Sequence, residues 1–138
     1  MSAALSSSSN TLARLSLAVV VAHALIGVVH SAAHVAMHIF MSLWQNAYIF
    51  AVIFALPVVA ALLLRRRARA GYLLLFLSML GSLLFGGYYH FVAPGPDNVN
   101  SMGGHAWAFP FRGSAVLLAL TEAAGAFLGL VGLLGRRR

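Results

Sequence analysis

Four histidines lie in one apolar stretch near the start of the 138-residue chain, at His23, His30, His34 and His38. Their spacing of seven, four and four residues places them along one slowly drifting stripe of a helix. Two histidines four residues apart on a helix can bind the same metal ion, and His30/His34 and His34/His38 both have this spacing. The stripe therefore predicts imidazole chemistry, and metal binding first of all, on one face of this segment.

Two other apolar stretches carry ionisable residues that can meet the stripe. His90 ends a row of small residues at steps of four, Ser78, Ser82 and Gly86. Glu122 shares a helical face with a close-packing GxxxG pattern, Gly125 and Gly129. Ionisable residues inside a membrane are rare and point to function. We therefore expect one site built from His30, His34, His38, His90 and Glu122.

The types of ligand atom limit which metal ions the site can bind. The chain has no cysteine, which excludes thiolate sites and iron–sulfur clusters. Imidazole and carboxylate suit zinc, copper(II) or iron, while Met37 and Met41 beside the stripe would add soft donors for copper(I). Glu122 would serve as a ligand, as a partner of an imidazole N–H, or as a proton acceptor. The sequence thus predicts a transition-metal site (Cu, Zn or Fe), with redox chemistry as one use.

The same residues also fit an organic cofactor. Two histidines from different helices hold haem b in membrane bundles, and His34 or His38 opposite His90 would form such a pair. A quinone site would instead use a histidine and Glu122 as proton partners. In either case the chain would be an electron-transfer or anchor subunit.

Two further interpretations stay open. A histidine ladder with a buried carboxylate resembles the ionisable chains of pumps, which predicts proton or metal-ion transport by an oligomer. Alternatively, the histidines bond one another in a structural or accessory subunit. The sequence leaves undecided whether His23, which lies deeper, and His105, in the longest loop, take part. No hydrolase or nucleotide-binding motif is present, so any enzymatic chemistry would belong to a bound metal or cofactor.

Membrane-spanning helices must position these residues. Apolar residues make up 62% of the chain and charged residues only 8%, which excludes a soluble fold. A span needs about 20 apolar residues, and four stretches qualify, at about 15–43, 47–64, 72–91 and 114–134. The short connections predict one all-α domain over residues 1–138, an up-down-up-down bundle with a long loop at 92–113.

The arginines predict the orientation. Eight of the nine fall on one side of the membrane if both termini are cytoplasmic: Arg14, Arg65, Arg66, Arg67, Arg69, Arg136, Arg137 and Arg138. Only Arg112 falls on the other side. We therefore expect an N-in, C-in protein of the plasma (inner) membrane, with the histidine site in its outer half. Its partners would be the lipid bilayer and a second copy or a larger membrane complex. Nucleic acid is excluded, because the basic clusters lack an aromatic platform.

Overall fold

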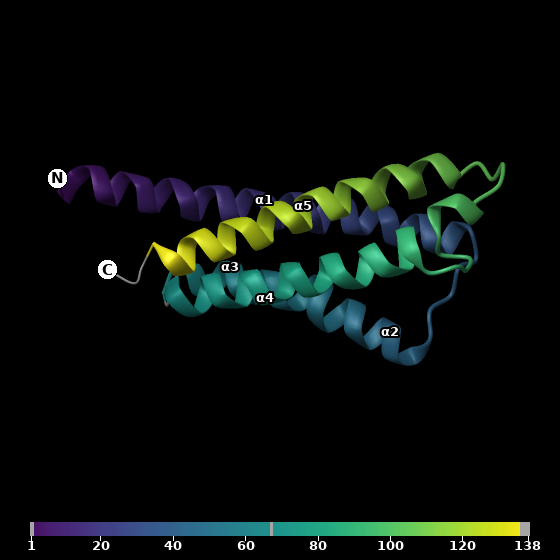
Figure 1. The fold of residues 1–138 in the computed structure, drawn as a ribbon, viewed down its shortest axis with the longest axis horizontal. Helices are drawn as coiled ribbons and strands as arrows, with labels where there is room; N and C mark the ends of the chain where they lie inside the picture. Colours follow the sequence, from purple (N-terminus) through teal and green to yellow (C-terminus); the bar gives the residue numbers. More distant parts are fainter. Residues whose placement is uncertain (1, 67, 136–138) are drawn as a thin grey trace.

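A computed structural model describes residues 2–66 and 68–135 of the chain (Figure 1). The described residues form helices and no strand. Four helical stretches are long and apolar enough to cross a membrane: Asn10–Ala36, Leu43–Leu64, Ala68–Val92 and Ala108–Leu134. The expectation of an all-helical chain with four such stretches is therefore confirmed.

Three long helices form the packed part of the bundle. Helix α5 (Ala108–Leu134) lies between α1 (Ser2–Ala36) and α4 (Ala68–Gly87) and packs against both. Glycines allow its close approach to α4: a β-carbon on Gly129 would lie 2.6 Å from the backbone nitrogen of Phe76, and one on Gly125 would lie 2.7 Å from the Met79 side chain. The GxxxG face of the last helix is therefore an interhelical contact, as small residues in membrane helices generally are.

The second span is broken into three pieces. It starts with α2 (Leu43–Tyr48), continues as a π-helical segment η1 (Ile49–Ala55) and ends with α3 (Leu56–Leu64). Pro57 lacks the N–H that a continuous α-helix would direct to Ile53, which is consistent with the irregular segment before it. Helix α3 packs on α4, whereas α2 diverges from α1 in Figure 1.

The first span is shorter than its apolar run. We expected it over residues 15–43, but α1 ends at Ala36. The chain turns at His38, whose φ is +55°. Two bonds close the end of the helix, from the Ile39 N–H to the His34 carbonyl (3.0 Å) and from the His38 N–H to the Val35 carbonyl (3.1 Å). This is a Schellman motif with His38 at the left-handed position that glycine usually occupies.

The other spans begin earlier than their hydropathy suggested. Ser42 starts α2 at Leu43, because its N–H donates to Gln45 Oε1 at 2.8 Å in a capping box. Helix α4 begins at Ala68, and a π-helical turn, η2 (Tyr88–Val92), ends it. Helix α5 begins at Ala108, with Pro110 in its first turn, where no N–H is needed. The long connection therefore covers residues 93–107, less than the expected 92–113, and contains one 3₁₀ turn, η3 (Val99–Ser101).

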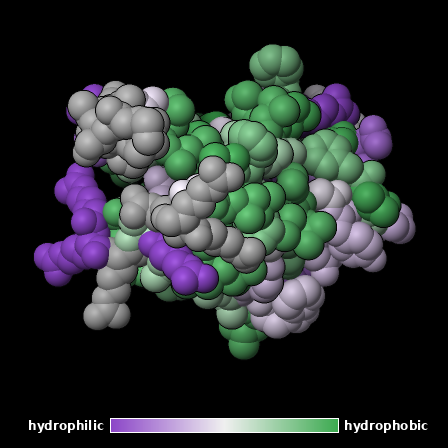
Figure 2. Space-filling model, turned by 60° about the vertical axis from the view of Figure 1, so that its left-hand side comes forward, coloured by the Kyte–Doolittle hydropathy of each residue, from purple (hydrophilic) through white to green (hydrophobic). Residues whose placement is uncertain are grey.

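The two ends of the bundle differ in charge. The start of α1, the α3–α4 turn and the end of α5 lie together at one end, here called the basic end (Figure 1). Its described arginines are Arg14, Arg65, Arg66 and Arg69, while Arg67 and Arg136–Arg138 lie outside the described residues. Figure 2 looks toward this end and shows hydrophilic groups beside a broad hydrophobic surface. The connections 37–42 and 93–107 form the opposite end, here called the loop end.

Candidate metal centre

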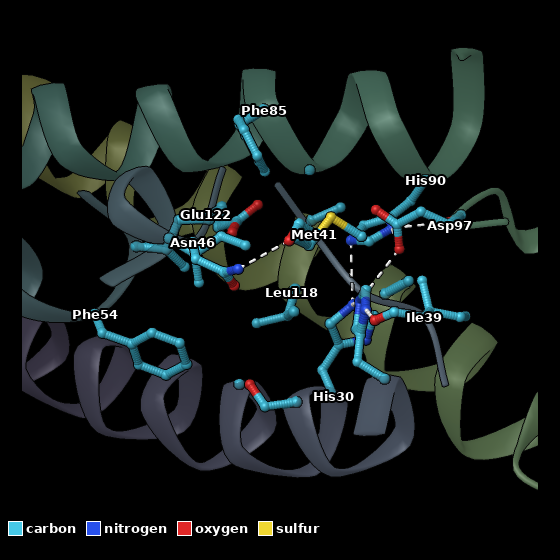
Figure 3. A pocket seen from close by; sticks show the side chains of 18 of the residues that line it. His30, Ile39, Met41, Asn46, Phe54, Phe85, His90, Asp97, Leu118 and Glu122 are labelled. Carbon is cyan, nitrogen blue, oxygen red and sulfur yellow. Dashed lines mark hydrogen bonds and ion pairs between the residues drawn. The ribbon is translucent and has the colours of Figure 1, made fainter. Parts of the chain in front are cut away.

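Four metal-ligating side chains converge at the loop end of the bundle. His30 and His34 lie one turn apart on α1, His90 lies on η2, and Asp97 lies in the 93–107 connection. One ligand atom from each side chain lies within 4.8 Å of those of the others. These four residues are called the His₃Asp cluster below. Figure 3 shows the His30 and His90 rings facing one another, with Asp97 beside them.

The ring nitrogens of the cluster approach closely. His30 Nε2 lies 3.1 Å from His34 Nε2 and 3.1 Å from His90 Nε2. Asp97 Oδ1 lies 3.1 Å from His34 Nε2 and 3.2 Å from His90 Nδ1. A tetrahedral ion with N and O ligands at 2.0–2.2 Å separates neighbouring ligand atoms by roughly 3.3–3.6 Å. The closest contacts are slightly shorter than this separation and no two ligand atoms are more than 4.8 Å apart, so the cluster has about the size that such an ion requires.

A serine fixes the tautomer of His30. Its Nδ1 lies 2.8 Å from Ser114 Oγ. The Ser114 hydroxyl donates its own hydrogen to the carbonyl of Pro110 at 2.7 Å, or of Phe111 at 3.0 Å. Ser114 Oγ is therefore left to accept, and His30 Nδ1 must be the donor. We assign the proton of a neutral His30 ring to Nδ1, which leaves a lone pair on Nε2.

A backbone carbonyl selects the same tautomer for His90. His90 Nδ1 lies 3.1 Å from the Asp97 carbonyl oxygen, which can only accept, so His90 Nδ1 donates and its Nε2 is left with a lone pair. His34 has an acceptor beside each ring nitrogen, because its Nδ1 lies 3.4 Å from the Ile39 carbonyl oxygen and its Nε2 lies 3.1 Å from Asp97 Oδ1. Metal-bound histidines are held as His30 and His90 are, with the distal N–H bonded to an oxygen of the protein.

Three imidazole Nε2 atoms and one carboxylate thus share a small volume. Asp97 Oδ1 is buried, and no donor among the described residues makes a well-oriented hydrogen bond to it, even though two ring nitrogens lie close by. The His90 Nδ1–H points to the backbone carbonyl of Asp97, which leaves this carboxylate oxygen without it. The Nε2 atoms of His30 and His90, at 3.1 Å, would both direct a lone pair at a cation between them.

The carboxylate itself is held in its ionised form. Burial alone would raise the pKa of Asp97, but hydrogen bonding of its side chain to His34 and His90, together with the positive charge of these imidazoles, outweighs burial and lowers the pKa from 3.8 to about 2. Asp97 therefore contributes a negative charge to the cluster at every physiological pH.

An aromatic ring closes one side of the cluster. Phe111 is fully buried, and its ring centroid lies 4.7 Å from that of His30, 5.0 Å from that of His34 and 5.6 Å from that of His90. Phe111 packs against all three imidazoles, restricts their rotation and keeps water from this side.

The structure brings together three of the five expected site residues. His30, His34 and His90 lie together. His38 lies in the turn after α1 with its ring beside Phe40, outside the cluster. Glu122 lies deeper in the bundle, where its Oε1 is 3.2 Å from His23 Nε2. His23, whose part the sequence left open, is thus the partner of Glu122.

Asp97 is the cluster member that sequence reasoning missed. The neighbouring Asn98 caps the next turn, with its Oδ1 accepting from the Asn100 N–H at 2.9 Å, whereas Asp97 faces the histidines. One feature of the sequence could have pointed to Asp97 as a ligand: it is the one acidic residue of the long connection, seven residues after His90. His105 lies elsewhere, where its Nδ1 accepts from the Trp107 N–H at 3.1 Å.

A cavity of about 260 Å³ borders the cluster and extends toward the middle of the bundle. It is called the side cavity below. Helices α1, α4 and α5 form its bundle side, and α2 and η1 form its other side. His34 and His90 line one part of it and Glu122 another, so the cavity connects the cluster with the deeper carboxylate (Figure 3).

No protein-family model matches the sequence, and neither curated proteins nor solved structures give a match to the chain.

Proposed function

We propose that the chain is a membrane protein that binds one transition-metal ion through His30, His34, His90 and Asp97. The observation that carries the proposal is the convergence of the three Nε2 atoms on one another and on Asp97, while an oxygen lies beside each Nδ1. A cation at their meeting point would neutralise Asp97 and supply the missing partner of its Oδ1.

The donor set narrows the metal to zinc, copper or iron. Three imidazoles and one carboxylate suit Zn²⁺, Cu²⁺ and Fe²⁺ and disfavour Mg²⁺ and Ca²⁺, which prefer oxygen. Because His34 and His90 also line the side cavity, an added fifth ligand would approach from that side. Copper or iron would give the site redox chemistry, and zinc would give it Lewis-acid chemistry.

The geometry favours a single ion over haem. Haem held by His34 and His90 would need its macrocycle between the two rings. The His30 ring lies beside the line that joins them, with its centroid 4.7 Å from that of each of the other two, and it occupies space that the macrocycle would need. His38, the other ligand considered for haem, faces away from the cluster in the turn after α1.

We also propose that the chain lies in the plasma (inner) membrane with both termini cytoplasmic. The grouping of Arg14, Arg65, Arg66 and Arg69 at the basic end supports this orientation through the positive-inside rule. The loop end would then face outward and the metal would lie in the outer half of the bilayer. A second copy or a larger complex would cover part of the apolar surface.

Metal analysis of tag-free protein purified in mild detergent tests the proposal. We expect about one zinc, copper or iron ion per chain, lost in His90→Gln and in Asp97→Asn. His105→Gln and His38→Gln should keep it and serve as matched controls. Metal-free protein with an intact helical circular-dichroism spectrum, after incubation with each metal, would overturn the proposal. A Soret band with stoichiometric iron would replace it with haem.

A further inference from the structure

The side cavity opens on the flank of the bundle, between α1 and α2. Residues at its mouth are exposed on both sides, Ser31 and Val35 on α1 and Asn46 on α2. Its floor lies where η1 touches α1: a β-carbon on Gly27 would lie 2.9 Å from the Phe54 ring. The divergence of α2 in Figure 1 therefore marks an opening toward the surface that lipid would cover.

The walls of the side cavity are mainly hydrocarbon. Its apolar lining comes from several elements, namely Val35, Ile49, Ile53, Phe85 and Leu118. The ionisable groups lie on the bundle side, at the His₃Asp cluster and at Glu122. A molecule that fills this space must have an apolar body and one small polar end that points into the bundle.

The second carboxylate oxygen of Glu122, Oε2, indicates which polar group would fit at that end. Oε1 pairs with His23, while Oε2 faces Gly86: a β-carbon on Gly86 would lie 3.8 Å from Oε2 and 3.6 Å from His90 Cδ2. Glu122 and His90 therefore both border the part of the side cavity beside Gly86. Two carboxylates, Glu122 and Asp97, repel an anionic head group there and accept a hydrogen bond from a hydroxyl.

We propose that the side cavity binds a lipid-soluble molecule that carries a hydroxyl group, such as a long-chain alcohol, a phenol or a quinol. The molecule enters between α1 and α2, its apolar body lies against Ile53 and Phe85, and its hydroxyl donates to Glu122 Oε2. One consequence rests on the proposed function: the hydroxyl oxygen would lie beside the metal. The binding itself depends only on the cavity and Glu122.

Photolabelling tests this site in protein reconstituted into phosphatidylcholine nanodiscs. The probe is a sixteen-carbon primary alcohol with a diazirine in its chain, and the matched probe is the corresponding carboxylic acid. We expect the alcohol to label peptides that line the cavity, with protection by unlabelled hexadecanol and at least about threefold less labelling by the acid. Equal labelling by the two probes would overturn the proposal.

Two variants separate the cavity from bulk lipid. Ile53→Trp fills the cavity and should abolish protected labelling, whereas Phe50→Trp places the same ring on a residue that is 74% exposed and should not. Glu122→Gln keeps an acceptor for His23 and removes the charge, so the acid probe should gain labelling relative to the alcohol. Labelling that is unchanged in Ile53→Trp would also refute the site.

The experiment also distinguishes failure of this inference from failure of the metal proposal. Labelling is measured with a chelator present and again after metal addition. If the protein binds no metal and labelling persists in chelator, the metal proposal fails and the cavity site is supported on its own. A protein that binds metal at the cluster but shows no protected labelling would refute the cavity site alone.

Discussion

His23 Nε2 lies 3.2 Å from Glu122 Oε1, and this contact joins α1 to α5 in the middle of the bundle. The two residues are 1% and 3% exposed. Residue 23 is the midpoint of the 10–36 span, and residue 121 is the midpoint of the 108–134 span. The pair therefore lies where a bilayer would contain least water, and it aligns the two helices along their axes.

Glu122→Ala should destabilise the folded bundle, because it leaves His23 buried without its carboxylate. Removal of one partner of a buried hydrogen bond costs about 1–3 kcal/mol, with smaller values between membrane helices. We expect a loss of about 1–2 kcal/mol in unfolding by SDS in mixed micelles.

Glu122→Gln serves as the control for this change, because it keeps an oxygen that accepts from His23. It should lose much less stability and should bind metal as the wild type does. Loss of the metal in Glu122→Gln would show that Glu122 belongs to the metal centre after all.

Ser114→Ala should weaken metal binding without unfolding the protein. The substitution removes the acceptor of the His30 Nδ1–H, 2.8 Å away, and frees the ring to rotate or change tautomer. Loss of such an outer partner typically weakens metal affinity about 10–100-fold. Competition with a chromophoric zinc chelator measures the change.

Two other buried serines provide matched controls for Ser114→Ala. The Ser78 and Ser82 hydroxyls donate to carbonyls of their own helix, at 3.3 and 2.9 Å. Ser78→Ala and Ser82→Ala should leave metal affinity unchanged. Equal affinity in all three variants would mean that His30 is not held by Ser114 in the metal-bound protein.

Local patterns predicted the part of the site that depends on one helix. The four-residue spacing located His30 and His34 because both lie on the continuous helix α1. The apolar runs located the four spans because the length of an apolar segment decides whether it can cross a bilayer. The row of small residues on α4 also placed His90 correctly beside this pair.

The rest of the site depends on where helices end and how the connections fold back. The apolar run continues past Ala36, so hydropathy placed the centre of the first span too far along the chain. His23 was therefore expected to lie nearer the cytoplasmic side than Glu122. His38 continues the four-residue spacing, but no glycine signals the turn that removes it from the stripe. Asp97 reaches the histidines through a long connection whose path no periodicity encodes.

His38→Gly should stabilise the protein and keep its metal. His38 has a φ of +55°, a conformation that is unfavourable for a residue with a β-carbon and accessible to glycine. The greater freedom of glycine in the unfolded chain offsets part of this gain, so we expect an increase of up to about 1 kcal/mol. His105→Gly, at a position without positive φ, should bring no such gain. A loss of metal in His38→Gly would instead assign His38 to the centre.

Acid should remove the contribution of Asp97 to stability within a defined pH range. Its pKa is 3.8 in an ordinary environment and about 2 in the folded protein. A lowered pKa means that the stabilisation is complete above the unfolded value and disappears as the pH falls through the folded value. In metal-free protein with a chelator present, the difference in melting temperature between wild type and Asp97→Asn should be constant above about pH 5 and vanish near pH 2. A difference that is already absent at pH 5 would show that the imidazoles do not hold this carboxylate in its ionised form.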